Sequence, residues 1–560
     1  MKKFFKSVFA IALALICCFG CFACNPVIDT DSHDESKSQL LVYSYNGGVG
    51  NEWLDEVINR FQEKFADYEF EPGKKGVEIS PNKTKDEATL ASIATAPEDV
   101  FFSEWVDIPA LVSQNKVMDI HEVVTTPLNE YLEGRTTDTD TIADKLYLET
   151  QDFFTFKDNK YYALPHYSHT PVFTYNKKLF DTKGLYFAKD PTGTELPQKF
   201  ISTTNTVKSC GPDGLFDTED DGLPATWDEM YELFDYMKMK SVTPFIWSGK
   251  NAAGYTKGIL TNAYLNLAGA QSVRYNYTLD SGTNTIDIVT GWESNKADAK
   301  PTVGTAKVEA SNPVVLNKQL EKYQALSILD NMQDTGKWQH DDCTNTTQDM
   351  LPTQYSYLVG ANTGKSTAIL IEGSYWYNES KDANYLTALR GTYSNFDELN
   401  DFRVMPLPRN YSGSAKDFEG TYQGKTVVTD AADSIACINA RLANNPNKLK
   451  LAKMFLAFCY TQESLKEFTE ITDTPRYMKY DIDETKLTDY GRSVYTYVKN
   501  SDIVFPYSSN LQYISQKTRL SLHGQSTFWD SAHSGGEAPY VGLKGTSKEV
   551  KAFFTKFMLK

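Results

Sequence analysis

The sequence has little cysteine and no long apolar run, and each shortage excludes a class of protein. Only eight of its 560 residues are cysteine, and four of these lie among the first 24 residues. The other four, at positions 210, 343, 437 and 459, are widely spaced and form no CxxC pair, so no disulfide framework is expected. After the N-terminal segment, no stretch reaches the ~18 consecutive apolar residues that a membrane-spanning helix requires.

Signals for nucleic acids, nucleotides and common hydrolases are also missing. The net charge is −17 at pH 7 and no long basic run occurs, which argues against a nucleic-acid partner. A glycine-rich loop, 46–50, lies between a strand-like segment, 40–45, and an amphipathic helix, 52–65, but it matches neither GxGxxG nor the P-loop pattern. HExxH and GxSxG do not occur either. The loop and the helix N-terminus still offer free backbone N–H groups to a ligand.

What the sequence has in abundance is aromatic residues, which make up 13% of the chain and include 34 Tyr and 31 Phe. Tyrosine combines a flat apolar face with a polar tip, although most tyrosines serve packing. The hydrophobic and charged fractions of 41% and 23% are typical of a globular protein. At roughly 150 residues per domain, the length allows two to four domains.

The first 24 residues predict a lipoprotein signal peptide. Three lysines precede the apolar stretch 8–19, which is too short to span a membrane and is typical of a secretory signal. A small residue directly precedes both Cys21 and Cys24, as in the bacterial lipobox, where the cysteine is lipidated and begins the mature protein. We expect lipidation at Cys24, with Cys21 as the alternative, followed by a flexible polar tether over 25–39. An ordinary cleaved signal is the other interpretation.

Strand-like and helix-like segments alternate along the remaining chain. Residues 99–102 and 366–371 resemble buried strands, and Thr226 begins a capping box for a helix that continues to about residue 240. No internal repeat is evident, so the pattern predicts an α/β fold rich in parallel strands. The polar stretch 278–313 is interpreted as a loop-rich insertion.

Four blocks of sequence, taken in order, resemble the carbohydrate-binding lipoproteins of bacterial ABC importers, which are relatives of the maltodextrin-binding protein. They are VYSYNGGVGNEWLDEVINRFQEKF (42–65), PEDVFFSEWVDIPALVSQNKVMDI (97–120), YYALPHYSHTPVFTYNKKLFDTKGL (161–185) and STAILIEGSYWYNES (366–380). With shorter matches further on, they span nearly the whole chain after the signal. The chain departs from a typical member by inserts at about 186–222 and 272–320.

The resemblance implies an α/β fold of two lobes joined by a hinge, like that of periplasmic binding proteins, with each lobe discontinuous in sequence. On this mapping lobe one is 40–168 plus 435–480, and lobe two is 169–430 plus 481–560. A sugar, most simply an oligosaccharide, would bind in the cleft, and lobe closure would report occupancy to the permease subunits in the membrane. The implied protein is a monomer without catalytic activity, lipid-anchored at the extracellular face of the cytoplasmic membrane.

Sugar sites combine aromatic faces with planar hydrogen-bonding groups, and the resemblance directs attention to several such residues. Trp105, with Glu104 and Asp107 beside it, follows a strand end, where ligands bind in open α/β sheets. Trp376, or its neighbour Tyr375, matches the stacking aromatic of the family, and we expect one of the two to stack on the sugar.

The remaining candidates have weaker support. Trp529 matches another stacking position, with a buried helix aromatic as the alternative, and Trp247 belongs either to the cleft or to the core. Asn46 would meet sugar hydroxyls from lobe one, whereas Tyr167 and His169 lie near the expected chain crossing. By contrast, two tryptophans fall within helical patterns and are interpreted as structural: Trp53 and Trp227.

An acidic loop partly matches a calcium-binding pattern. Asp217, Glu219 and Asp221 occupy positions 1, 3 and 5 of such a loop, a glycine follows at position 6, and Asp228 falls at position 12. Glutamate at position 3 and aspartate at position 12 depart from the usual pattern. The loop is therefore either a structural calcium site, in a protein without other cofactors, or an ordinary acidic surface loop.

Two other functions stay open. A secreted enzyme that degrades polysaccharide needs two carboxylates across the scissile bond, and the 73 acidic residues could supply them, for example as Glu104 and Asp107. A binding protein for a peptide or another polar solute would need fixed charges in its cleft, which the sequence does not display.

Overall fold

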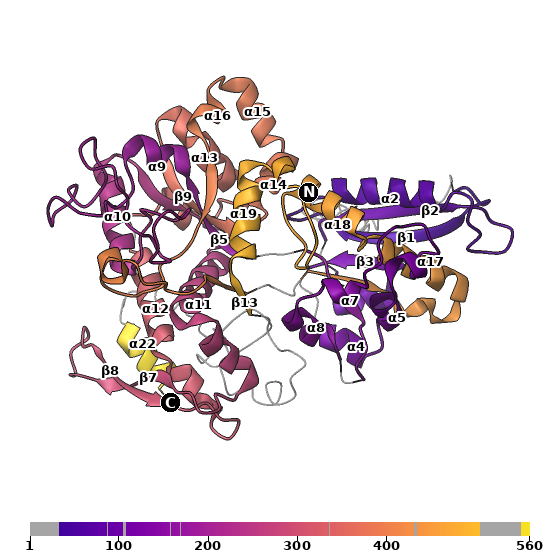
Figure 1. The fold of residues 1–560 in the computed structure, drawn as a ribbon, viewed down its shortest axis with the longest axis horizontal. Coiled ribbons are helices and arrows are strands. Elements are labelled where there is room, and N and C mark those ends of the chain that lie inside the picture. The colour runs from indigo at the N-terminus through magenta and orange to yellow at the C-terminus, as the bar shows by residue number, and fades with distance from the viewer. Residues whose placement is uncertain are drawn as a thin grey trace, which may run out of the picture.

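The computed structural model describes residues 33–86, 88–104, 108–156, 158–167, 170–334, 336–429, 434–504 and 550–559. They form two α/β lobes, each built around its own sheet, as the ribbon shows (Figure 1). The α/β architecture expected from the alternating sequence pattern is confirmed. The predicted richness in parallel strands is not observed, because both main sheets mix parallel and antiparallel pairs. Several sequence-based candidates lie outside the described residues: the signal peptide with Cys21 and Cys24, and Trp105, Asp107, His169 and Trp529.

The sheet of lobe one has five strands in the order β2-β1-β3-β12-β4. Strands β1 (Ser38–Tyr45), β2 (Val77–Thr84) and β3 (Val100–Ser103) are parallel. Strand β12 (Ile435–Ile438) lies antiparallel between β3 and β4 (Ala163–Pro165). A strand from the last third of the chain is therefore an interior strand of a sheet that otherwise forms from the first third.

Helix α2 (Glu52–Lys64) shows why the sequence pattern predicted the core of lobe one correctly. Its apolar residues recur at helical spacing, and the face that they form is buried. Trp53 lies in this face and packs against Phe102 and Phe468, with ring centroids 5.0 and 5.2 Å apart, so its structural interpretation agrees with its burial. The other helices of this lobe are α3 (Leu90–Thr95), α4 (Ile108–Ser113), α5 (His121–Thr125), α6 (Leu128–Tyr131), α7 (Ile142–Lys145), α8 (Leu148–Phe154), α17 (Pro446–Phe458) and α18 (Gln462–Thr472).

The sheet of lobe two has four strands in the order β10-β5-β9-β6. Strands β6 (Thr243–Ile246) and β9 (Thr367–Gly373) are parallel, and β5 (Pro171–Asn176) is antiparallel to both β9 and β10 (Phe402–Met405). Two short strands, β11 (Val427–Thr429) and β13 (Asp502–Val504), form a separate parallel pair. Every residue of β9 is buried, as expected for a strand covered on both faces.

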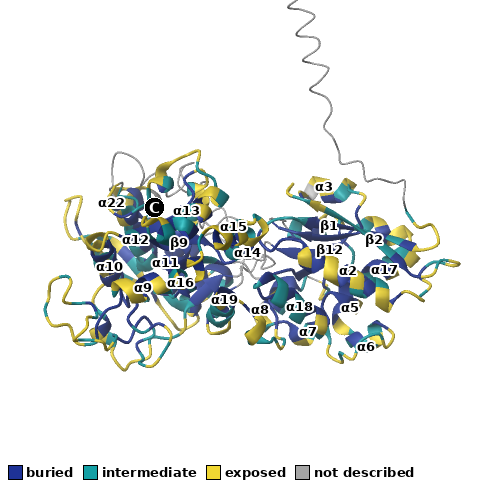
Figure 2. Cartoon of the chain, turned by 90° about the horizontal axis from the view of Figure 1, so that it is seen from above, coloured by how far each residue is buried: buried dark blue, intermediate teal, exposed yellow. Residues whose placement is uncertain are grey.

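Helices cover this second sheet, and Figure 2 shows the buried interior beneath their exposed outer faces. Half of the capping box predicted at Thr226 is present: its side chain accepts a hydrogen bond from the Glu229 N–H at the start of α10. The Glu229 carboxylate does not complete the box, because it accepts hydrogen bonds from the backbone N–H groups of Ala225 and Ala415 instead. Trp227, in the first turn of that helix, is buried as its structural interpretation requires. The helices are α9 (Lys177–Lys183), α10 (Trp227–Met239), α11 (Ala252–Thr278), α12 (Leu320–Met332), α13 (Met350–Thr363), α14 (Trp376–Asp382), α15 (Tyr385–Thr392), α16 (Phe396–Leu399), α19 (Asp489–Lys499) and α22 (Val550–Phe557).

The stretch interpreted as a loop-rich insertion contains regular structure. Strands β7 (Ile286–Trp292) and β8 (Pro301–Ala306) pair as an antiparallel hairpin. The hairpin contacts the last helix, because Trp292 Nε1 donates a hydrogen bond of 2.9 Å to Thr555 Oγ1 of α22. The polar residues around them hid the strands. Only Ile286 and Val289 of β7 are buried, and no residue of β8 is.

None of the helices in the described ranges combines the length and the apolar character that crossing a bilayer requires.

Candidate functional site

The two lobes meet where the glycine loop 46–50 of lobe one contacts the segment 373–382 of lobe two. Asn378 Nδ2 donates a hydrogen bond of 3.3 Å to the Gly48 carbonyl oxygen. Lys381 Nζ lies 3.2 Å from a carboxylate oxygen of Glu52, at the start of α2. We call these two segments together the lobe junction.

The Tyr375 ring packs directly against the backbone of Gly48 in this junction. A Cβ atom added to Gly48 would lie only 2.6 Å from Cδ2 of the Tyr375 ring, well inside van der Waals contact. Glycine is therefore the one residue that lets the loop approach the ring this closely. The Tyr167 ring lies nearly perpendicular to the Tyr375 ring, with centroids 6.4 Å apart.

Both sheets direct the carboxyl ends of parallel strands toward the junction. Strand β1 ends directly before the glycine loop, and β9 ends at Gly373, two residues before Tyr375. Strand β3 ends at Ser103, next to Glu104. In open α/β sheets ligands bind outside the carboxyl ends of the strands, because loops and helix N-termini gather there. The topology therefore makes the junction the candidate ligand site.

The prediction that Trp376 could stack on a ligand is wrong. Trp376 has no exposed surface, and its Nε1 donates a hydrogen bond of 3.0 Å to Thr174 Oγ1 inside lobe two. Its ring packs against Phe402 and Tyr490, with both pairs of centroids 5.4 Å apart. Residue 376 starts α14 and points inward, whereas Tyr375 is only half-buried and lies at the junction. Tyr375 is therefore the candidate stacking residue of the pair.

Three further candidates lie at or beside the junction in different states of burial. Asn46 is half-buried, and its backbone N–H donates a hydrogen bond of 2.6 Å to the Thr84 carbonyl oxygen. Glu104 and Tyr167 are both buried. The sequence did not decide whether Trp247 belongs to the cleft or to the core. In the structure it belongs to the core of lobe two, where it stacks on Phe245 with ring centroids 5.2 Å apart.

Sequence reasoning missed a pair of buried carboxyl groups, Glu372 and Glu379. Tyr255 Oη donates a hydrogen bond of 2.5 Å to Glu372, at the end of β9, and Gln354 Nε2 donates one of 2.8 Å to Glu379 in α14. Burial raises the pKa of Glu372, and burial together with the charge of Glu372 raises the pKa of Glu379. The sequence did offer a signal for this pair. Both glutamates belong to the fourth block, 366–380, where Glu372 directly precedes the Gly-Ser-Tyr-Trp turn.

The predicted calcium ligands do not gather around one point. Asp228 Oδ2 accepts a hydrogen bond of 3.1 Å from the Gly413 N–H on another loop, whereas Asp221 accepts one of 3.0 Å from the Asp217 N–H. Glu219 belongs instead to the lining of a lobe-two pocket. Within the described residues, no group of three or more His, Cys, Asp or Glu side chains is arranged to hold a metal ion. Calcium binding by this loop stays a prediction.

Comparisons with known proteins agree with this architecture. A family model for bacterial extracellular solute-binding proteins matches residues 51–331, about half of the chain. Among solved structures, a chitin oligosaccharide binding protein has a TM-score of 0.51 at 15% identity, with 94% of this chain and all of that chain covered. No curated protein sequence matches the chain.

Two more solved structures share the fold. A protein from a study of xylan utilisation by Caldanaerobius polysaccharolyticus has a TM-score of 0.54 at 15% identity, covering 93% of this chain and 99% of that one. A maltose-bound protein of T. maritima has a TM-score of 0.50 at 15% identity, covering 92% and 99%. The two-lobe fold expected from the sequence blocks is confirmed. With half of its length matched by the family model, the chain belongs to the bacterial extracellular solute-binding proteins.

Proposed function

We propose that this protein binds an oligosaccharide at the lobe junction and delivers it to the permease subunits of an ABC importer. The observation that carries the proposal is the convergence of both sheets on Tyr375 and the glycine loop. An aromatic ring from one lobe there faces backbone amides from the other. Such a combination suits a sugar, which presents apolar C–H faces and a rim of hydroxyls.

The buried carboxyl groups near Tyr375 support the same ligand class. Glu372 and Glu379 bring oxygen atoms close to the end of β9, and protonated carboxyl groups both donate and accept hydrogen bonds. Binding across two lobes would favour the closed arrangement, because a ligand that contacts both lobes stabilises the state in which they meet. A closed pair of lobes is then the signal that a permease can recognise.

The proposal also covers anchoring and the fate of the sugar. The protein acts as a monomer, held to the membrane by a lipid on Cys24 or Cys21, and releases its sugar chemically unchanged. Mass spectrometry of the mature N-terminus tests the anchor: an acylated cysteine is expected, and an unmodified N-terminus beyond residue 24 would contradict it.

A glycan panel with a thermal-shift readout tests the binding function. A sugar that binds only the folded protein raises its melting temperature, by an amount that grows with the ratio of sugar concentration to Kd. The same sugar should be recovered intact by chromatography after long incubation. Products that accumulate with time would instead support the polysaccharide-degrading enzyme, and a shift with oligopeptides alone would support a peptide-binding protein.

A further inference from the structure

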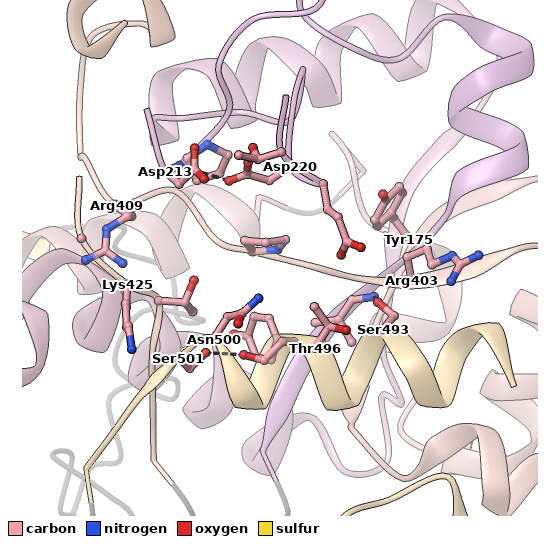
Figure 3. Close-up of a pocket in the computed structure, with 18 of the residues that line it drawn as sticks. Tyr175, Asp213, Asp220, Arg403, Arg409, Lys425, Ser493, Thr496, Asn500 and Ser501 are labelled. Atoms are coloured by element: carbon pink, nitrogen blue, oxygen red, sulfur yellow. Dashed lines mark hydrogen bonds between the residues drawn. The ribbon is translucent and has the colours of Figure 1, made fainter. Parts of the chain in front are cut away.

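Lobe two contains a pocket of about 950 Å³ that is separate from the lobe junction. Its walls come from four parts of the chain (Figure 3). They are Tyr175 and Lys177 where β5 meets α9, the insert around residues 208–220, the edge strand β10 with its continuation to residue 426, and helix α19 with the two residues that follow it. No described residue of lobe one lines it, and Tyr375 and Glu372 are not among its lining residues. The volume lies at the upper end of the range found for small-molecule sites.

The charges in this pocket are nearly balanced, which argues against a site for anions. Three of its six cationic side chains already form ion pairs with carboxylates, and a fourth, Lys208, places its ammonium group 3.3 Å over the Tyr186 ring. Arg409 and Lys425 remain, and neither forms an ion pair with a described residue. Asp213, Glu219 and Asp220 also line the pocket, and none of these three acidic side chains forms an ion pair in this part of the structure. The paired cations are Lys177 with Asp181, Arg403 with Asp401, and Arg492 with Asp489.

Arg409 supplies hydrogen-bond donors that the protein leaves partly unused. Its Nε donates a hydrogen bond of 2.9 Å to the Gln423 carbonyl oxygen. Its Nη1, by contrast, is buried and has no hydrogen-bond partner among the described residues. Buried donors of this kind are normally satisfied, so Nη1 is a donor that the described protein atoms leave unused beside the pocket.

Acceptors and small polar groups line the same pocket as Arg409. One carboxylate oxygen of Asp213 accepts a hydrogen bond of 2.8 Å from the Leu215 N–H, and the Thr218 side chain also interacts with this carboxyl group. Thr496, on α19, and Asn500, directly after it, form the opposite wall, as the close-up shows. Planar carboxylate, amide and guanidinium groups bind neighbouring hydroxyls of a sugar ring through paired hydrogen bonds.

An aromatic face completes the set. Tyr422 lines the pocket, yet 55% of its surface is exposed, which is unusual for so large a side chain. An exposed ring beside polar groups of both kinds fits a ligand with apolar C–H faces and many hydroxyls.

We propose that this pocket is a second saccharide site, which binds a short neutral oligosaccharide independently of the lobe junction. Balanced charge inside the pocket and the −17 charge of the whole chain favour a neutral glycan over a uronate or a phosphate. The inference goes beyond the proposed function, because it concerns different residues on one lobe and needs no lobe closure.

Titration calorimetry on the full mature chain tests the proposal with four trisaccharides: maltotriose, raffinose, triacetylchitotriose and xylotriose. At least one should bind the unmodified protein with two classes of sites. Tyr422→Ala and Asn500→Ala should each weaken one class at least tenfold, and should leave the other class and the melting temperature unchanged. Tyr355→Ala, which removes another exposed tyrosine ring, is the matched control and should alter neither class.

Each site is tested by its own variant, so the experiment can contradict this proposal without contradicting the proposed function, and the reverse. Tyr375→Ala should weaken only the class that Tyr422→Ala leaves intact. If no trisaccharide gives a class that depends on Tyr422, the second site does not exist, even when a Tyr375-dependent class is present. Binding of inorganic phosphate or trigalacturonic acid at Tyr422 without any neutral sugar would also overturn the proposal.

Discussion

Arg476 Nη1 lies 3.0 Å from Nδ1 of His166 and 2.8 Å from the His166 carbonyl oxygen, inside the core of lobe one. Only 2% of Arg476 is exposed. Its guanidinium group makes no ion pair with a described residue and is instead surrounded by aromatic rings, whose centroids lie 4.3 to 6.0 Å away. The contact joins the segment before the first lobe crossing to the segment that follows α18. The four rings belong to Trp53, Phe102, Tyr460 and Phe468.

This contact predicts how stability depends on pH. Burial, together with the positive charge of Arg476, lowers the pKa of His166 well below its usual value. A histidine whose native pKa is depressed contributes its full stability above the unfolded pKa, near 6.5, and loses it as the pH falls toward the native pKa. Denaturant unfolding at pH 7.5, 6 and 5 should show a loss approaching about 1.4 kcal/mol per pH unit below about 6 from this group.

His166→Asn is the comparison for that measurement, because its amide oxygen can still accept a hydrogen bond from Arg476 but does not titrate. Its free energy of unfolding should fall less steeply between pH 6 and 5 than that of the unmodified chain. Equal slopes for the two proteins would show that His166 is not buried in the neutral form.

Tyr375→Ala should weaken sugar binding at the junction by about 2 kcal/mol or more, which corresponds to a loss of at least about 30-fold in affinity. Rigid aromatic residues at the centre of a site contribute large buried area at low entropic cost. Titration calorimetry measures the affinity, and Tyr355→Ala is the control because its ring is exposed and lies outside the junction. Unchanged affinity in Tyr375→Ala would remove the junction as the sugar site.

Trp376→Ala should instead lower the free energy of unfolding by about 3 to 5 kcal/mol, because it leaves a cavity in a packed core. It also removes the donor to Thr174 Oγ1. Denaturant unfolding with a fluorescence readout measures the loss, which should be several times larger than that of Tyr375→Ala. A Trp376→Ala protein with normal stability and lost binding would return this residue to the ligand site.

Gly48→Ala should reduce sugar affinity through the same junction, because the added methyl group overlaps the Tyr375 ring and holds the lobes apart. Gly254→Ala is the control, since a Cβ atom added there meets no other atom within 4 Å. In a Tyr375→Ala background Gly48→Ala should cost almost nothing more, because neighbours that act through one contact are not additive. If Gly48→Ala lowered the sugar affinity equally in the unmodified protein and in Tyr375→Ala, the two residues would not be in contact in the bound state.

Removing calcium tests the acidic loop. If an ion stabilises the native state, chelation should lower the melting temperature by an amount that follows RT ln(1 + [L]/Kd). Elemental analysis of the purified protein should then find calcium, and Asp221→Asn should abolish the effect of the chelator. An unchanged melt in chelator, without bound calcium, makes the segment an ordinary acidic loop.

Most of the correct predictions of local structure came from the periodicity of apolar residues in the sequence. The helical spacing in 52–65 identified a buried face correctly, including Trp53, because an amphipathic helix must turn its apolar side inward. The order of the four blocks likewise led to the two-lobe fold. The turn after β9 was harder, since a shift of one residue at a strand end exchanges the two faces and so confuses Tyr375 with Trp376.

The rest depends on contacts between distant parts of the chain. Glu372 and Gln354 belong to one buried network with Tyr255, and Arg409 meets Asp213 and Asn500 around one pocket only after folding. No spacing pattern in one sequence records such neighbours. The β7–β8 hairpin was also concealed, because a register shift between Val289 and Gly291 interrupts the alternation in β7, and β8 has no buried residue.

The position of β12 in the first sheet has a consequence for the order in which the protein can fold. Strand β12 separates β3 from β4, yet it follows β4 by about 270 residues of chain. While the chain emerges N-terminus first, lobe one therefore has a gap in its sheet until residue 438 is available, long after most of lobe two has been synthesised. Contacts of such long range form late because loop closure must come first. A chain that completes its first lobe only near its end stays unfolded longer, which suits a polypeptide that must be threaded through a membrane before it folds.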